Sequence, residues 1–284
     1  MSRTITVIGA TGHLGRLAVE ALLERGVAPS DIRATGRATE RLADLADRGV
    51  QVLRVDRDDE AAVADAVRGA ASVLLVSGTE PGRVEQHRRV VEAAREAGVE
   101  QLVYTSGPHA RGSSVRLLAD HAATEELLET SGVPHTVLRN AWYVENYTGQ
   151  VETYRAHGMV GSAGEGRVSL APRREYAEAA AVVLTTDGHL GKVYELGGEA
   201  HTLAEVAAVI GETIGQEVAY TDVPVEQLQQ VLAGAGVPAP MDAVLADVDR
   251  GIAAGELLVP TTDLERLLGR PATDLRQAVK EALA

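Results

Sequence analysis

Short apolar runs recur along the first 140 residues, and helical patterns that mostly end at a glycine separate them. The expected strands are residues 4–8, 31–36, 51–56, 72–77, 101–106 and 135–140. The expected helices between them are residues 14–25, 41–48, 59–68, 84–97 and 115–130. This alternation predicts an α/β fold of the Rossmann class, a doubly wound parallel sheet with helices on both faces.

The pattern changes after residue 140. Helices are expected at 145–157, 174–184, 203–214, 225–235, 241–254 and 275–283, a glycine-rich turn region at 158–166, and extended segments at 193–196 and 218–223. We therefore expect residues 1–140 to form the sheet domain, to which a helix and strand at about 174–197 return. The remainder of 141–284 is expected to form a smaller, mostly helical lobe over the carboxyl edge of the sheet.

Composition narrows the class of protein. The chain has 284 residues, 45% hydrophobic and 24% charged, as in ordinary globular proteins, and its net charge of −14 argues against general nucleic-acid or anionic-membrane binding. It has no cysteine, so disulfides, thiolate metal sites and cysteine nucleophiles are excluded. The start shows no signal peptide, and no apolar run could span a membrane, so a cytoplasmic protein is expected.

The residues GATGHLG at 9–15 follow the first expected strand and open the first expected helix. Gly9 permits a sharp turn, Gly12 lets backbone approach a pyrophosphate, and Gly15 lets the helix pack on the strand. The helix N-terminus offers free N–H groups to the phosphates. The whole segment is therefore predicted to bind a dinucleotide: Gly9, Ala10, Thr11, Gly12, His13, Leu14 and Gly15.

The second expected strand ends at Gly36-Arg37, where sites for NAD usually carry a carboxylate. A guanidinium can hold a 2′-phosphate, so we favour NADP(H) over NAD(H), with a solvated surface arginine as the alternative. Ser77 and Gly78 end the fourth strand, where small residues admit the cofactor. Asp56 ends the third strand and either accepts from the adenine amine or caps the helix that begins near residue 59.

Many Rossmann oxidoreductases pair a catalytic tyrosine with a lysine four residues later. The chain has two lysines, Lys192 and Lys280, and the residues four positions before them are Gly188 and Arg276. Neither is a tyrosine, so carbonyl–alcohol catalysis by the usual Tyr–Lys pair is excluded. A quinone is already electron-poor and can accept a hydride without a strong general acid. A protein that binds the nucleotide without turnover fits equally well. Motifs for a metal site (HExxH) or a serine hydrolase (GxSxG) are missing.

Several strings resemble one family. They are GATGHLG at 9–15, QHR at 86–88, YTS at 104–106, ADHAATEELLETSG at 119–132, LRNAWYVENY at 138–147, REYAEAAA at 174–181, GKVYELGG at 191–198 and TTDLERLLGRP at 261–271. Together they resemble the NmrA-like, atypical short-chain dehydrogenases, and among these the bacterial NADPH-dependent quinone reductases. The resemblance implies NADP(H), a quinone acceptor and no flavin or metal. The family also contains nucleotide-sensing regulators.

The resemblance also implies roles for single residues. Gly9 to Gly15 hold the pyrophosphate and Arg37 the 2′-phosphate. His121 stands where reductases of the wider superfamily carry a catalytic lysine. The remaining cofactor contacts implied are Ser77, Gly78, Thr105 in the YTS string, and Asn140, Ala141, Trp142 and Tyr143 at the nicotinamide end.

Two of these residues carry polar chemistry of their own. His121 can relay a proton, or it forms an exposed pair with Glu125 one helical turn later. Asn140 ends the sixth strand, where its carboxamide can bind the nicotinamide amide or a substrate oxygen. The alternative is that the side chain only caps the loop that follows.

The aromatic and amide residues that follow form the expected substrate set. Trp142 and Tyr143 can stack on a flat ring, with Tyr143 also expected to act in catalysis, or they pack between the lobes. Asn146 can contact a quinone oxygen, and Tyr147 and Tyr104 are weaker stacking candidates. Two functions stay open: hydride transfer to a quinone, or a redox sensor that acts through a protein partner. The sequence is compatible with a homodimer.

Overall fold

The computed structural model describes residues 3–284, which divide into two compact units. Unit 1 comprises the described residues up to Ser106 together with Asp120–Arg139 and Arg173–Tyr194. Unit 2 comprises Gly107–Ala119, Asn140–Pro172 and Glu195–Ala284. Gly107–Ala119, expected with the sheet domain, thus belongs to unit 2. The cause is that Ser113 and Ser114 donate to the Glu256 carboxylate and the Arg116 N–H donates to Asp247.

The central sheet has seven strands in the order β10-β6-β5-β4-β1-β2-β3. They are β1 (Ile5–Ile8), β2 (Ile32–Gly36), β3 (Gln51–Arg54), β4 (Ser72–Leu75), β5 (Gln101–Ser106), β6 (His135–Asn140) and β10 (Val193–Leu196). Strands β1 to β6 pair parallel, as predicted. The chain order reverses direction between β1 and β4, and in such sheets ligands bind beyond the carboxyl ends at that point.

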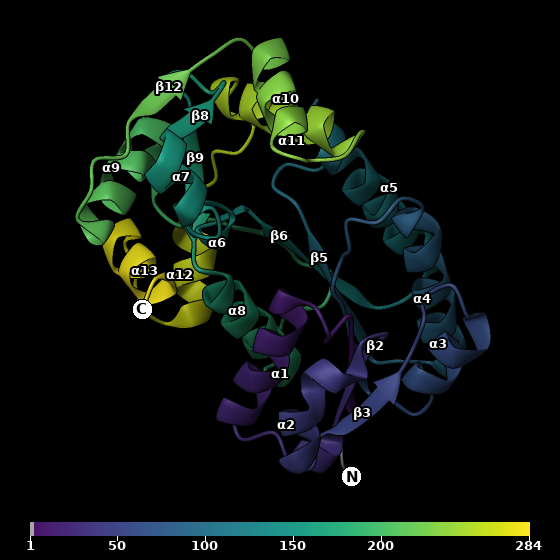
Figure 1. Ribbon diagram of the computed structural model, residues 1–284. Helices are drawn as coiled ribbons and strands as arrows, with labels where there is room; N and C mark the ends of the chain where they lie inside the picture. The colour runs from purple at the N-terminus through teal and green to yellow at the C-terminus, as the bar shows by residue number, and fades with distance from the viewer. Residues whose placement is uncertain (1–2) are drawn as a thin grey trace. The chain divides into compact units, whose positions relative to one another are not determined.

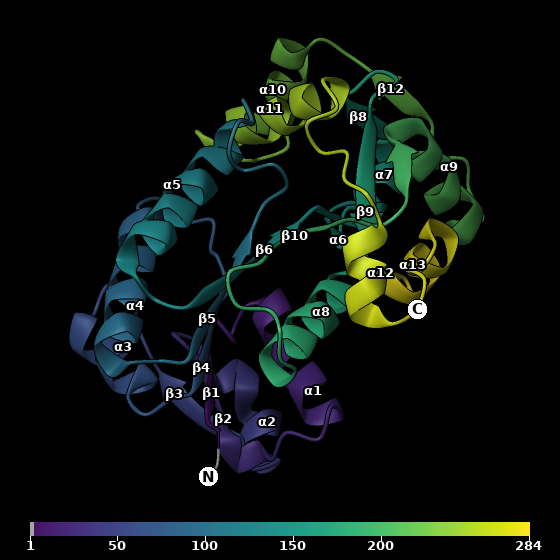
Figure 2. The same cartoon turned by 180° about the vertical axis from the view of Figure 1, so that it is seen from behind.

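Helices cover both faces of this sheet (Figures 1 and 2). Helices α1 (His13–Glu24) and α8 (Arg173–Thr185) pack together on one face, and α3 (Glu60–Val67), α4 (Arg83–Ala97) and α5 (Arg116–Ser131) lie on the other. Short helices η1 (Pro29–Asp31), η2 (Thr39–Leu42) and α2 (Ala43–Asp47) flank β2. The core between the sheet and the α3–α5 layer is apolar, with Val63, Val73, Val90, Leu102 and Leu128 fully buried.

Unit 2 has its own core and two small sheets. Strands β7 (Trp142–Tyr143), β9 (Arg167–Ala171) and β11 (Ala200–Thr202) form one sheet, and β8 (Met159–Gly161) pairs parallel with β12 (Tyr220–Asp222). Its helices are α6 (Glu145–Thr148), α7 (Val151–His157), α9 (Leu203–Ile214), α10 (Val225–Gly234), α11 (Met241–Ala253), α12 (Thr262–Leu268) and α13 (Leu275–Ala282). Val168, Val206, Ile210, Ile252 and Val279 lie in its core.

Two expectations for unit 2 were wrong, and one helix was missed. The helix expected at 145–157 is two helices, because the chain turns at Gly149-Gln150 between α6 and α7. The turn region at 158–166 contains β8, whose partner β12 lies about sixty residues later in the sequence. Helix α12 was not expected. Within the described residues no helix is long and apolar enough to cross a membrane.

Candidate functional site

The glycine loop of unit 1 joins β1 to α1 at the carboxyl edge of the sheet. Gly9 has a φ of +94°, in the region that favours glycine, and the next N–H, of Ala10, donates to the Thr35 carbonyl at 2.8 Å. A Cβ on Gly15 would overlap the carbonyl oxygen of Gly9. Gly15 therefore allows α1 to pack directly against the end of β1, as the sequence predicted.

Gly12 has a different role in the same loop. It is the exposed N-cap of α1, no side chain caps this helix, and its first turn contains no acidic residue. A Cβ at Gly12 would meet nothing closer than the Gly9 carbonyl, at 3.4 Å. No side chain therefore caps the N–H groups of the first turn of α1, and the positive end of the helix dipole lies at an exposed residue, an arrangement that suits a pyrophosphate. Thr11 is half-buried, His13 exposed, and Ala10 and Leu14 buried.

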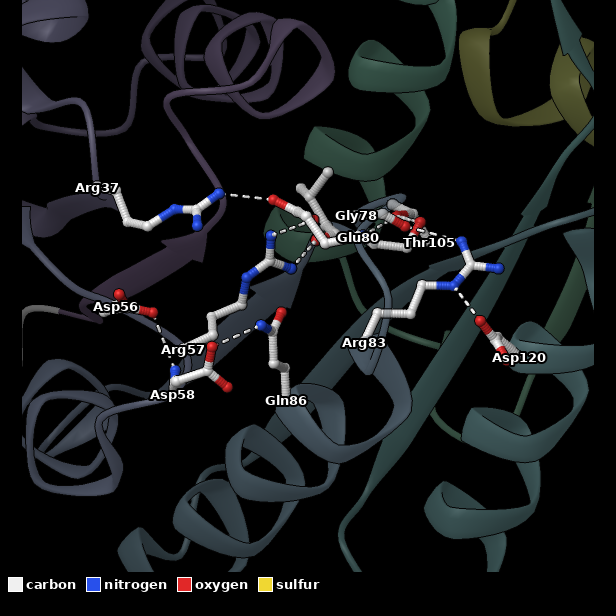
Figure 3. Close-up of polar contacts among 12 residues, drawn as sticks. Arg37, Asp56, Arg57, Asp58, Gly78, Glu80, Arg83, Gln86, Thr105 and Asp120 are labelled. Carbon is white, nitrogen blue, oxygen red and sulfur yellow. Dashed lines mark hydrogen bonds and ion pairs between the residues drawn. The ribbon is translucent and has the colours of Figure 1, made fainter. Parts of the chain in front are cut away.

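Two arginines and a glutamate meet beyond the ends of β2, β3 and β4 (Figure 3). Arg37 follows β2, and its Nη2 lies 2.7 Å from Oε1 of Glu80, in the segment after β4. Nη2 of Arg57, which follows β3, lies 3.8 Å from Oε2 of the same carboxylate. The Arg37 side chain is 60% exposed, so its guanidinium is accessible to a ligand.

The helix-capping alternative for Asp56 was wrong. Asp59 caps α3, since its carboxylate accepts from the Ala62 N–H at 3.1 Å. Asp56 is exposed and accepts from the Asp58 N–H at 3.1 Å, a local turn contact. Its contact to an adenine stays a prediction.

The ends of β4 and β5 are joined by polar contacts. The Ser77 N–H donates to the buried Thr105 hydroxyl at 3.0 Å. The carbonyl of Gly78 accepts from Nη1 of Arg83 at 2.7 Å, and Nε of Arg83 bonds Asp120 at 2.9 Å (Figure 3). Arg83, which sequence reasoning missed, is 3% exposed and fixes the backbone at the position expected to contact the cofactor.

His121 lies inside unit 1. Its Nδ1 is 2.8 Å from the hydroxyl of Tyr104, and burial lowers the pKa of the imidazole well below its usual value. The ring of Tyr104 also packs edge-on against His87, whose Nδ1 bonds Thr124 at 2.9 Å. Tyr104 is fully buried and is a core residue, not a surface on which a ligand can stack.

The exposed pair of His121 with Glu125 was wrong. Glu125 is 3% exposed and its carboxylate accepts from Arg139 at 2.9 and 2.6 Å and from the Ser106 hydroxyl at 2.6 Å. Helix α5 turns this face toward the sheet, and the sequence could not show that, since both faces of the helix carry charge.

The segment Asn140–Tyr147 belongs to unit 2. Asn140 is 3% exposed, and its amide nitrogen lies 3.4 Å from the hydroxyl of Tyr143. Its Oδ1 is buried and has no hydrogen-bond partner among the described residues. A buried acceptor without a partner at a strand end is unusual, and it suits a hydrogen-bond donor from a ligand. Loop capping does not explain it, because a capping side chain would have a backbone partner.

The rest of this segment is divided between accessible and core positions. Trp142 and Tyr143 are half-buried in β7, where they pair with Leu170 and Ala171, and Ala141 is buried. Asn146 is half-buried, and its carbonyl accepts from Gln150. Tyr147 packs in the core of unit 2, and burial raises the pKa of its phenol well above the usual value. Its expected contact with substrate stays a prediction.

The structure thus gathers the expected pyrophosphate, 2′-phosphate and fourth-strand residues in unit 1. It gathers Asn140 to Tyr147 in unit 2. Within residues 3–284, no group of three or more His, Cys, Asp or Glu side chains could hold a metal ion. Sequence reasoning missed Arg57 and Glu80. The position of Arg57, directly after Asp56 at the end of the third strand, was a signal that could have identified it. Its residue type was not such a signal, because 25 of the 27 cationic residues are arginine.

Comparison with known proteins identifies the family of this chain. The model of the NmrA-like family matches residues 1–254. The chain belongs to the NmrA-like family. It is 40% identical over 278 residues to quinone oxidoreductase 2 of Escherichia coli, with 97% of each chain covered.

Two solved structures are also similar to this chain over nearly its whole length. The crystal structure of E. coli NADPH-dependent quinone oxidoreductase with NADPH matches with a TM-score of 0.94 at 39% identity, covering 99% of this chain and all of that one. Citrobacter triphenylmethane reductase with NADP(H) matches with a TM-score of 0.91 at 36% identity, with 99% and 100% covered.

Proposed function

We infer that this protein is an NADPH-dependent oxidoreductase that transfers a hydride to a quinone-type acceptor. The observation that carries the cofactor choice is the exposed guanidinium of Arg37 directly after β2, where a site for NAD would carry a carboxylate. The similarity to quinone oxidoreductase 2 over 97% of the chain supports the acceptor class.

The residues of unit 1 bind and orient the cofactor. The uncapped start of α1 at Gly12 holds the pyrophosphate, and Arg37 holds the 2′-phosphate. Arg83 fixes the Gly78 carbonyl, which keeps the end of β4 in one conformation against the cofactor. Bound NADPH supplies the hydride.

The residues of unit 2 position the acceptor. The orphaned Oδ1 of Asn140 is suited to accept from the carboxamide N–H of the nicotinamide, since a quinone has no N–H or O–H to donate. The half-buried rings of Trp142 and Tyr143 offer flat apolar surface to a conjugated acceptor ring. Two relatives support an electron-poor conjugated acceptor, since one is named for quinones and one for triphenylmethane dyes. Hydride transfer to the quinone gives the hydroquinone monoanion, and without a Tyr–Lys pair this anion takes one proton from solvent; no flavin is required.

The sensor alternative is less well supported. The relatives matched over nearly the whole chain at 36–40% identity are reductases by name. These relatives favour an enzyme over a sensor.

The test is NADPH oxidation, followed by loss of reduced-nicotinamide absorbance, with a small benzoquinone and a naphthoquinone. NADPH binding is measured in parallel by fluorescence. Saturable, quinone-dependent oxidation above the uncatalysed rate is expected. Tight NADPH binding without turnover on either quinone would contradict the enzyme and favour the sensor.

A further inference from the structure

The carboxylate of Glu80 lies between two guanidinium groups that come from different strand ends. Its Oε1 is 2.7 Å from Arg37 and its Oε2 is 3.8 Å from Arg57. A Cβ added to Gly78 would overlap the same carboxylate, so Glu80 folds back over the backbone that follows β4 (Figure 3). Glu80 thus occupies the edge of the sheet beyond β2, β3 and β4 with a negative charge.

Arg57 is held in place before any ligand arrives. Its side chain is only 17% exposed, and its Nη1 donates to the Val76 carbonyl at 3.3 Å. The next residue, Asp58, is fixed by α4, because Gln86 donates to one carboxylate oxygen at 3.0 Å and Arg89 to the other at 2.9 Å. Burial lowers the pKa of Arg57, and the Glu80 carboxylate opposes that shift. A desolvated guanidinium of this kind needs an anion beside it.

Glu80 is an anion that can be displaced. Its side chain is 39% exposed and lies in the connection between β4 and α4, outside any helix or strand. An ion pair whose carboxylate is open to water is weak, because water screens the attraction. A phosphate monoester carries more charge and three acceptor oxygens, so it can bond both guanidinium groups at once.

We propose that Arg37 and Arg57 form one two-arginine anion site, which Glu80 fills in the free protein and the 2′-phosphate of NADPH fills in the complex. This inference rests on the proposed cofactor and adds two residues that decide its selection. Arg57 is the second phosphate ligand. Glu80 is an internal competitor, whose carboxylate must leave the arginines before the phosphate can take its place.

Two opposite effects follow for the two side chains. Loss of the Glu80 charge removes the competitor, so ligands with a 2′-phosphate bind more tightly. Loss of the Arg57 charge removes a phosphate ligand, so the same ligands bind more weakly. If Glu80 merely neutralised Arg37 away from the phosphate, loss of the Glu80 charge would leave the preference for the 2′-phosphate unchanged. If Arg57 did not touch the phosphate, loss of the Arg57 charge would leave it unchanged as well.

The experiment compares two fragments, 2′,5′-ADP and 5′-AMP, which differ only in the 2′-phosphate. Their dissociation constants are measured by calorimetry on the full chain, for the wild type, Glu80→Gln, Arg57→Leu and Arg57→Lys. The readout is the ratio of the two constants, so a general loss of the adenosine site cancels. Matched controls are Glu92→Gln, exposed and paired with Arg88 on α4, and Arg68→Leu, exposed and paired with Asp65.

We expect Glu80→Gln to raise the preference for 2′,5′-ADP about three- to tenfold, and Arg57→Leu to lower it at least about tenfold. Arg57→Lys should lie between Arg57→Leu and the wild type, and both controls should leave the ratio unchanged. An unchanged or lower preference in Glu80→Gln, or an unchanged one in Arg57→Leu, overturns the inference. If the wild type itself does not prefer 2′,5′-ADP, the proposed cofactor fails as well. If Glu80→Gln or Arg57→Leu gives an overturning result while the wild type does prefer 2′,5′-ADP and Arg37→Ala abolishes that preference, the inference falls and the proposed cofactor stands.

Discussion

The hydroxyl of Tyr104 and Nδ1 of His121 lie 2.8 Å apart inside unit 1, and both residues are buried. This contact joins β5 to α5 and satisfies two polar groups at once. The imidazole is neutral at physiological pH, because burial places its pKa well below the usual value. The proton-relay role of His121 remains a prediction, but this geometry favours a role in holding the helix on the sheet.

Tyr104→Phe separates the two roles. It leaves the buried Nδ1 of His121 without its partner, so we expect the free energy of unfolding to fall by about 1–3 kcal/mol. We expect kcat for a quinone to fall far less than the about 100-fold that removal of a general acid costs. Urea unfolding and steady-state kinetics measure the two quantities. A collapse of kcat in His121→Gln at unchanged stability would instead establish the relay.

Gly12→Ala and Gly15→Ala should fail in different ways. A Cβ at Gly15 overlaps the Gly9 carbonyl, so Gly15→Ala should destabilise unit 1. Gly12 has ordinary φ and open space, so Gly12→Ala should fold normally and lose NADPH affinity, because the methyl group occupies the path of the pyrophosphate. Thermal unfolding and NADPH titration distinguish them. Normal NADPH binding by Gly12→Ala would place the pyrophosphate elsewhere.

Arg37→Ala tests the choice of cofactor. Loss of a charge-assisted contact to phosphate should weaken NADPH by about 1.5–3 kcal/mol, or roughly 10- to 150-fold. NADH lacks the 2′-phosphate and should be affected much less. The two dissociation constants are compared by fluorescence titration. Equal losses for both cofactors, or no loss, would contradict the assignment of Arg37.

Tyr143→Ala tests the substrate surface of unit 2. Removal of the half-buried ring should depress quinone turnover while NADPH still binds, and Tyr143→Phe should retain most of the turnover if the ring face is what matters. Initial rates of NADPH oxidation at several quinone concentrations give kcat and KM separately. Joint loss of turnover and NADPH binding would assign Tyr143 a structural role.

Asp249→Asn tests a half-buried carboxyl group in unit 2. Burial raises the pKa of Asp249 to about 6, although its carboxylate accepts from the Ser162 N–H at 2.8 Å. The native state therefore holds the proton more tightly than the unfolded state, so stability falls as pH rises from about 4 to about 6 and is then flat. We expect Asp249→Asn to be more stable than wild type above pH ~6, by up to about 3 kcal/mol, and equal near pH 4.

The measurement for Asp249 is urea unfolding at several pH values. The exposed Asp187→Asn serves as the control, and it should show no comparable change. A variant less stable than wild type at neutral pH would mean that the hydrogen bond from Ser162 outweighs the cost of the buried charge.

Local pattern determined the sheet of unit 1 and its glycine loop. Strand and helix periodicity is written within each short segment, and the spacing of Gly9, Gly12 and Gly15 carries its own turn geometry, so β5, β6 and α9 begin and end where the sequence placed them. The identity of Arg37 at the end of β2 was enough to favour NADP(H) for the same reason. These features depend on neighbours along the chain.

Only the tertiary structure decided which distant side chains meet and which are desolvated. β8 needs β12 as a partner, and Tyr104 meets His121 only when α5 lies on the sheet. Arg57 gains Glu80 only because the segments that follow β3 and β4, strands that are not neighbours in the sheet, come together beyond their ends. Burial then sets the charge of these groups, as for Asp249. Such contacts arise from packing of segments far apart in the sequence, and no local pattern of residues encodes that packing.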